Sequence, residues 1–88
     1  MSEPELSPRR RRLLFRACHR GTKEADLMVG GFVARHIRSL TEEELDELER
    51  VLEQADVDLA DWLTGRRPVP PALASPLLLR MIRETCGA

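Results

Sequence analysis

With 88 residues, the chain is long enough for one domain with one modest hydrophobic core and too short for a second domain. Hydrophobic residues make up 42% and charged residues 33%, which is typical of a soluble globular protein and excludes a fibrous or wholly disordered chain. The net charge of −1 argues against general affinity for nucleic acid, and the low aromatic content of 3% favours an aliphatic core built from helices.

The charges are distributed unevenly along the chain. Residues 1–40 carry a net charge of +5, residues 41–65 carry −9 and residues 66–88 carry +3. A folded chain of this kind has a basic end and an acidic face, and such a field can orient a charged partner. We therefore expect charge to guide how this protein meets another molecule.

The cysteines indicate a reducing compartment, and the apolar runs are too short for a membrane span. Cys18 and Cys86 form neither a CxxC pair nor a cysteine-dense framework, so we expect reduced thiols. No apolar run approaches the roughly 18 residues of a membrane span. The stretch RRRRLLFRACHR is faintly similar to a twin-arginine signal, but Arg16 interrupts its apolar part. Glu3 and Glu5 argue against an organelle transit peptide.

The first predicted element is a helix over about residues 8–19, which follows a flexible N-terminus of residues 1–7. Ser7 and Pro8 are typical of an N-cap and a first helical position, because proline lacks the amide hydrogen that has no partner there. Gly21 is predicted to end the helix. Its apolar stripe is Leu13, Leu14, Ala17 and Cys18.

A second helix is predicted to begin at Thr22 or Lys23 and to carry the strongest helical pattern in the chain. Its stripe positions are Ala25, Met28, Val29, Phe32, Val33, His36, Ile37 and Leu40. Gly30 and Gly31 inside this helix each cost roughly 1 kcal/mol relative to alanine. The pair indicates either close packing of a neighbour or a bend.

The stretch LTEEEL predicts a well-specified start for a third helix. Thr41 and Glu44 form a capping box, and Leu40 and Leu45 form a hydrophobic staple around it. The buried stripe of this helix is predicted to be Leu45, Leu48, Val51 and Leu52.

A short fourth helix is predicted after an Asp56 or Asp58 cap, with Gly65 at its end. Its apolar residues are Leu59, Trp62 and Leu63. Residues 65–71, GRRPVPP, are then expected to form a stiff linker.

A fifth helix is predicted from the cap-and-proline pair Ser75 and Pro76, with Gly87 beyond its end. Its inner face is Leu78, Met81 and Ile82. Connections of roughly two to six residues favour antiparallel neighbours. The sequence therefore predicts an all-α fold, a compact bundle of four to five short antiparallel helices, with a single helical domain over residues 8–86.

Neither catalysis nor a metal site is expected. Cys18 and His19 are adjacent in a helix and so point to different faces, while His36 and Cys86 are distant in sequence. The chain has no GxSxG elbow, no His–Glu helix signature and no GxGxxG motif. We therefore predict no catalytic, metal-binding or cofactor-binding residue, and we interpret His36 as a partly buried, hydrogen-bonded structural histidine.

The basic run from Arg9 to Arg12 is open to two interpretations. A basic helix on a small α-domain is typical of a nucleic-acid contact. The interpretation we prefer is a solvated basic end that keeps the first helix in water. The acidic run from Glu42 to Asp61 is interpreted as helix surface, with carboxylates where the helix dipole favours them.

The corner RGTKE, residues 20–24, lies between the first two predicted helices. Gly21 is predicted to take a left-handed conformation, in which a side chain would add about 1–2 kcal/mol of strain. Its missing side chain allows another protein's backbone to come close, while Arg20 and Glu24 rise on either side as a directional docking surface. The alternative is that Arg20 and Glu24 only pair with each other, for at most about 1 kcal/mol.

At this corner the sequence resembles the FAD assembly factor family of succinate dehydrogenase, the SdhE type in bacteria, also called succinate dehydrogenase assembly factor 2. The stretch RGTKE matches the family's RGxxE motif, and Asp26 fits its ExD extension. Residues 52–65, LEQADVDLADWLTG, resemble the family's acidic segment with its Trp-containing helix. The resemblance covers about residues 9–70.

The resemblance implies a bacterial cytoplasmic protein that is not an enzyme. It implies binding to the flavoprotein subunit of succinate dehydrogenase or fumarate reductase, and promotion of covalent FAD attachment to a histidine of that subunit. The implied partner-binding residues are Arg20, Gly21, Glu24 and Asp26. FAD would belong to the partner, and the free protein would be a monomer. The alternatives are a small helical nucleic-acid-binding regulator that uses Arg9 to Arg12, and a structural subunit that needs its partner to stay folded.

Overall fold

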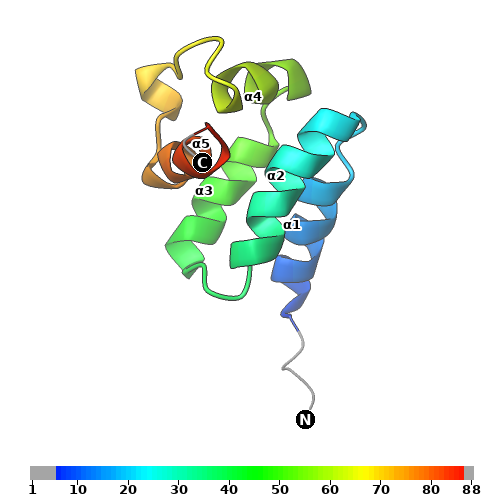
Figure 1. Cartoon of the computed structure of the whole chain (residues 1–88). Helices are drawn as coiled ribbons and strands as arrows, with labels where there is room; N and C mark the ends of the chain where they lie inside the picture. The colour runs from blue at the N-terminus through cyan, green and yellow to red at the C-terminus, as the bar shows by residue number, and fades with distance from the viewer. Residues whose placement is uncertain (1–5, 87–88) are drawn as a thin grey trace.

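The computed structural model describes residues 6–86, which form five α-helices and one short 3-10 helix (Figure 1). The elements are α1 (Pro8–Cys18), α2 (Lys23–His36), α3 (Glu42–Leu52), α4 (Asp56–Leu63), η1 (Pro71–Leu73) and α5 (Pro76–Cys86). Residues 6–86 contain no strand, so the all-α prediction is confirmed. The flexible tail predicted for residues 1–7 falls largely outside the described residues, as does Gly87.

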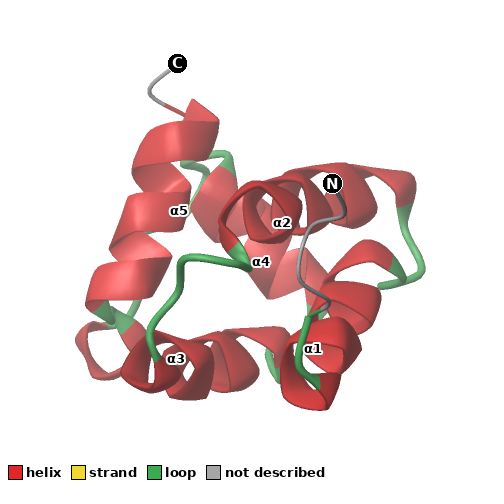
Figure 2. Cartoon of the chain, turned by 90° about the horizontal axis from the view of Figure 1, so that it is seen from below, coloured by secondary structure: helices red, strands yellow, loops and turns green. Residues whose placement is uncertain are grey.

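Helices α1, α2 and α3 lie side by side with alternating direction, and the other two cross them (Figure 1). Helix α4 lies across the end at which α3 finishes, and α5 is seen nearly along its axis in this view. Figure 2, seen from below, shows α1 and α3 next to each other in the lower part of the picture, with α2 and α5 above them. The antiparallel prediction therefore holds for α1 with α2, whereas α1 and α3 pack side by side in the same direction and α4 and α5 cross them.

The core is made of the aliphatic stripes that the sequence predicts. Helix α3 buries the four predicted residues, and α4 buries its three. The pattern of the second helix extends further than the helix itself, because α2 ends at His36 while Ile37 and Leu40 stay buried in the turn that follows. In that turn the backbone amides of Ser39 and Leu40 both donate to the carbonyl of His36.

The predicted helix starts are confirmed at four of the five α-helices. Ser7, Thr22 and Ser75 each accept a hydrogen bond from the amide three residues on. Thr41 makes the full capping box, with its hydroxyl 3.1 Å from the Glu44 amide and its own amide 2.8 Å from the Glu44 carboxylate. These contacts satisfy amides that a helix leaves without partners at its first turn.

The predicted aspartate cap of α4 is wrong. The residue before this helix is Ala55, whose side chain makes no capping hydrogen bond, and Asp56 is already inside the first turn. The carboxylate of Asp56 instead accepts a hydrogen bond from Arg20 Nε at 2.6 Å. Asp56 therefore pairs with a residue far away in the sequence and does not form the helix cap that the local sequence predicts.

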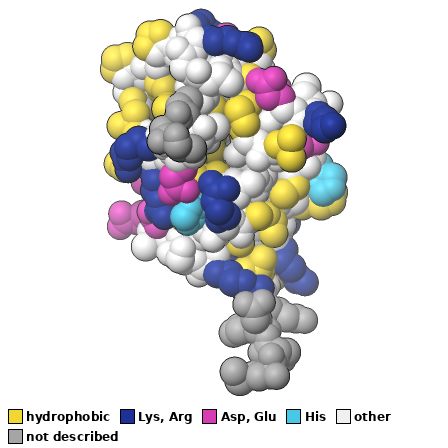
Figure 3. Space-filling model, viewed as in Figure 1, with side chains coloured by type: hydrophobic (Ala, Val, Ile, Leu, Met, Phe, Trp, Pro, Cys, Tyr) yellow, Lys and Arg dark blue, Asp and Glu magenta, His cyan; other side chains and the backbone are white. Residues whose placement is uncertain are grey.

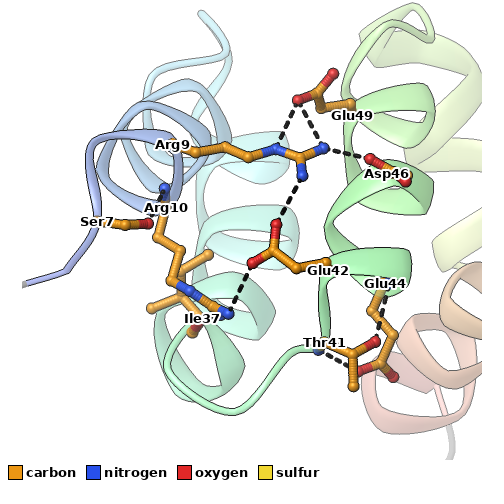
Figure 4. A network of polar contacts seen from close by, with 9 residues as sticks. All are labelled: Ser7, Arg9, Arg10, Ile37, Thr41, Glu42, Glu44, Asp46 and Glu49. Carbon is orange, nitrogen blue, oxygen red and sulfur yellow. Dashed lines mark hydrogen bonds and ion pairs between the residues drawn. The ribbon is translucent and has the colours of Figure 1, made fainter.

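The basic run of α1 is divided between structure and surface (Figure 4). The guanidinium of Arg9 contacts three carboxylates of α3, at 3.2, 2.5 and 3.0 Å; these belong to Glu42, Asp46 and Glu49. Arg10 donates to the carbonyl of Ile37 at 2.6 Å. Only Arg11 and Arg12 are exposed. The predicted solvated basic end is therefore wrong for Arg9 and Arg10, which tie α1 to α3 and to the turn after α2.

Histidine His36 is a structural residue, as its position in the stripe predicts. Its Nε2 lies 2.8 Å from Glu84 Oε1, and Arg80 Nη2 lies 3.1 Å from its Nδ1. Since the guanidinium can only donate, Nδ1 is the acceptor and Nε2 carries the proton. The hydrogen bond from His36, with help from Arg35 and Arg80, holds the pKa of Glu84 below its ordinary 4.5. This cluster links α2 to α5.

The two glycines inside α2 have different environments, which yields a matched test. A β-carbon on Gly30 would lie 3.0 Å from Cys18 Sγ, 3.1 Å from Cys18 Cα and 3.3 Å from the Ala17 carbonyl oxygen. On Gly31 it would meet only the end of Arg35, at 3.8 Å. Close packing of α1, one of the two predicted explanations, therefore applies to Gly30.

Replacing Gly30 by alanine should lower the free energy of unfolding by about 1 kcal/mol or more, because backbone atoms of α1 must move apart. Replacing Gly31 by alanine should raise it by about 0.5–1 kcal/mol, because alanine favours the helix. Denaturant unfolding of both variants measures the difference. A gain of stability in both would contradict the close approach at Gly30.

Candidate functional site: the corner between α1 and α2

Gly21 forms an exposed corner between α1 and α2. Its φ is +108°, in the region that disfavours residues with a β-carbon, so the predicted positive-φ glycine is confirmed. A β-carbon built on it would have no atom within 4 Å among the described residues. The backbone conformation therefore requires glycine here, and the space in front of the corner is open.

The side chain of Arg20 points into the molecule. Its Nη1 donates to the Leu52 carbonyl at 2.8 Å, its Nη2 donates to the Gln54 carbonyl at 2.5 Å, and its Nε donates to Asp56. Only 9% of the side chain is exposed. The prediction that Arg20 rises from the corner as an outward docking group is therefore wrong.

The end of α3 explains why Arg20 is drawn inward. The last carbonyls of a helix lack partners within the helix and carry partial negative charge, which a planar guanidinium can satisfy at several atoms. Here α3 ends at Leu52, and the short connection to Asp56 adds a second carbonyl and a carboxylate. Arg20 thus joins the α1–α2 corner to the α3–α4 corner.

Asp26 supports the same corner from α2. Its Oδ1 accepts a hydrogen bond from the backbone amide of Arg20 at 2.6 Å, and Thr22 between them caps the helix. The loop that contains Gly21 is therefore held at both of its sides. A rigid loop loses little conformational entropy when a partner binds to it.

Glu24 is the outward-facing charge of the motif. It is exposed, and its side chain forms no hydrogen bond or ion pair with another residue of the range 6–86. The alternative in which Glu24 pairs with Arg20 is therefore wrong, since the contacts of Arg20 lie elsewhere. Of the four predicted site residues, Gly21 and Glu24 face outward, while Arg20 and Asp26 hold the corner in place.

A shallow pocket of about 390 Å³ adjoins Glu24. It is lined by Thr22, Glu24, Asp56, Val57, Ala60, Asp61 and Arg66. Val57 is 66% exposed and Leu27, one turn beyond Glu24, is 67% exposed. Sequence analysis missed both residues, although each is a large apolar residue that stands off the buried stripe of its helix, which is the signal that could have found them.

Two kinds of site are not found in the described part of the chain. Residues 6–86 contain no group of three or more His, Cys, Asp or Glu side chains that could hold a metal ion. Their helices also include none with the length and hydropathy needed to cross a membrane. The corner is therefore the site that we consider further.

Comparison with known proteins assigns the chain to a family. The family model described as Sdh5, flavinator of succinate dehydrogenase, matches residues 11–86. The FAD assembly factor SdhE of Acetobacter pasteurianus is 48% identical over 85 residues, which cover 97% of this chain and 78% of that protein.

Mitochondrial relatives extend the same assignment. The succinate dehydrogenase assembly factor 2 of Candida glabrata is 35% identical over 82 residues, 90% of this chain and 54% of that protein. The protein of the same name from Saccharomyces cerevisiae is 35% identical over 86 residues, 94% of this chain and 52% of that protein. The chain thus spans about half the length of these two relatives. With its RGxxE corner and five helices, it belongs to the Sdh5 family, the flavinators of succinate dehydrogenase.

Proposed function

We propose that this protein is an assembly factor that binds the flavoprotein subunit of succinate dehydrogenase, or of fumarate reductase, and promotes covalent attachment of FAD to a histidine of that subunit. Its family and the names of its relatives support the assembly role. The observation that carries the proposal is that the RGxxE residues form one corner, in which Gly21 and Glu24 are exposed while Arg20 is held inward by hydrogen bonds.

The proposed mechanism is conformational. Docking of the corner beside the immature flavin site would favour the arrangement in which the histidine and the flavin ring are aligned. A binding partner shifts such an equilibrium only as far as it binds one arrangement better than the other. Gly21 and Glu24 would contact the flavoprotein directly, while Arg20 and Asp26 would act by holding the corner in shape.

On this proposal the chain is no enzyme and holds no cofactor of its own. The flavin chemistry and the FAD belong to the flavoprotein. The free protein would be a cytoplasmic monomer. The competing function, a nucleic-acid-binding regulator that uses the run from Arg9 to Arg12, is less well supported, because Arg9 and Arg10 are engaged with α3 and the turn after α2.

A reconstitution assay tests this function. The apo flavoprotein subunit is incubated with FAD, with and without this protein, and covalent flavin is read by in-gel fluorescence after denaturation. Addition of the protein should raise the rate of covalent attachment, and the two proteins should be captured together. Unchanged flavin attachment with no complex, combined with salt-dependent DNA binding that is lost on replacing Arg11 and Arg12, would favour the regulator instead.

A further inference from the structure

We propose that the corner binds its partner through an apolar frame around Glu24, formed by Leu27 and Val57. The flavoprotein surface that it meets would accordingly present a cationic side chain surrounded by apolar residues. This inference rests on the proposed function and adds the chemistry of the surface that is recognised.

Three of the four exposed large apolar residues lie on the helices that meet at the corner. Among the described residues, four large hydrophobic side chains are exposed: Phe15 at 62%, Leu27 at 67%, Val57 at 66% and Leu79 at 42%. The three most exposed belong to α1, α2 and α4, whose ends meet at Arg20. Exposed apolar side chains near one another mark an interaction surface, so the position of these residues around Glu24 decides whether they form one.

Two of these side chains flank the free carboxylate. Leu27 follows Glu24 by three positions, so the two side chains share one face of α2. Val57 lines the same pocket as Glu24, and it follows Asp56, which Arg20 fixes in position. Phe15 reaches the corner less directly, by stacking on His19 with ring centroids 4.0 Å apart. Leu27 and Val57 therefore form the core of the frame.

Among the described residues, Glu24 is the carboxylate of this pocket that forms no ion pair, while the one arginine lining the pocket, Arg66, lies 3.8 Å from Asp61. Of the carboxylates that line the pocket, Asp56 is paired with Arg20, and Asp61 lies 2.7 Å from Arg67 Nε. Glu24 has no ionic partner among residues 6–86. Docking removes water from the apolar frame, and a carboxylate that loses water requires a cation or a donor. An arginine or lysine of the partner meets that requirement.

The arrangement agrees with the surface seen in Figure 3, in which apolar side chains are visible over α1 and α2. Other exposed charges of the described surface are also without ion pairs, such as Lys23 and Glu43, so Glu24 is distinguished by its apolar neighbours. A surface that is apolar around one unpaired charge gives both affinity, through the buried area, and orientation, through the ion pair.

The test measures the affinity of the apo flavoprotein subunit for variants of the full chain. Leu27→Gln and Val57→Thr should each raise Kd roughly tenfold, because each removes apolar contact area. Leu79→Gln is the matched control, since it replaces an exposed apolar residue on α5 and should leave Kd within about twofold. Thermal melting of all three should stay close to that of the unchanged protein.

The charged part of the frame has its own matched pair. Glu24→Gln should raise Kd roughly tenfold and reduce the dependence of Kd on salt. Glu43→Gln, at an exposed position of the first turn of α3, should do neither. Equal effects of Leu27→Gln, Val57→Thr and Leu79→Gln on a protein that binds would overturn this inference and leave the proposed function standing. A complete lack of binding by the unchanged protein would overturn both.

Discussion

Replacing Gly21 by arginine should abolish binding to the flavoprotein while the isolated domain stays helical. The φ of +108° makes any β-carbon strained, at a cost of about 1–2 kcal/mol. A domain of 88 residues has about 4–13 kcal/mol of stability, so the fold should survive this strain. The new side chain would extend into the open space in front of the corner, where the partner would have to lie.

The same variant would also place a positive charge beside Glu24, where we expect a cation of the partner. Loss of binding is therefore expected from bulk and from charge together, and covalent flavin should fall to the level seen without the factor. Titration of the apo flavoprotein gives the affinity, in-gel flavin fluorescence gives the product, and far-ultraviolet circular dichroism reports the helices.

Gly65→Arg is the control for backbone strain. Gly65 has φ +80° and no neighbour within 4 Å of a built β-carbon, and it follows the end of α4 opposite to Asp56. Its replacement should cost similar stability and leave binding largely intact. Equal loss of binding in the two variants would mean that strain, and not the corner, accounts for the effect.

Replacing Arg20 by alanine should lower the free energy of unfolding by about 1–3 kcal/mol, because partly buried hydrogen bonds to a charged group are lost. The change would leave the carbonyls of Leu52 and Gln54 and the carboxylate of Asp56 without their donor. Chemical denaturation measures this loss. Arg20→Lys should fall in between, since an ammonium lacks the planar fork that spans three acceptors.

Arg11→Ala provides the comparison for the loss of an arginine as such. Arg11 is exposed on α1, so its replacement should change stability by no more than about 0.5 kcal/mol. If Arg20→Ala were as stable as Arg11→Ala, the inward guanidinium described above would be incorrect, and an outward docking role for Arg20 would return.

Gly21 and Arg20 show how far the sequence predicts the fold and the site. Helix starts, glycine corners and buried stripes depend on residues a few positions apart, so the capping box at Thr41 and the positive φ of Gly21 could be predicted. The contact between Arg20 and Asp56 joins residues 36 positions apart. A contact between residues so far apart produces no periodic pattern in the sequence. The sequence therefore predicts an outward docking role for Arg20 and a helix cap for Asp56, and neither is correct.

The composition of the docking surface was hidden for a different reason. A helical stripe identifies the residues that face the core, and apolar residues that fall outside it receive no role from the pattern. Leu27 and Val57 are such residues, and only the packed structure shows that both are exposed and that Val57 lines a pocket with Glu24. The motif located the corner, whereas tertiary structure decided which of its side chains face outward.

The ion pairs between Arg9 and three carboxylates of α3 affect how a minimal fragment of this protein should be designed. The match to the family model begins at residue 11, so a fragment cut at that boundary would omit Arg9 and Arg10. Three carboxylates of α3 would then lose their arginine partner: Glu42, Asp46 and Glu49. Their mutual repulsion would weaken the packing of α3 against α1. Poor behaviour of such a fragment would reflect the chosen boundary, and not a weakness of the family's fold.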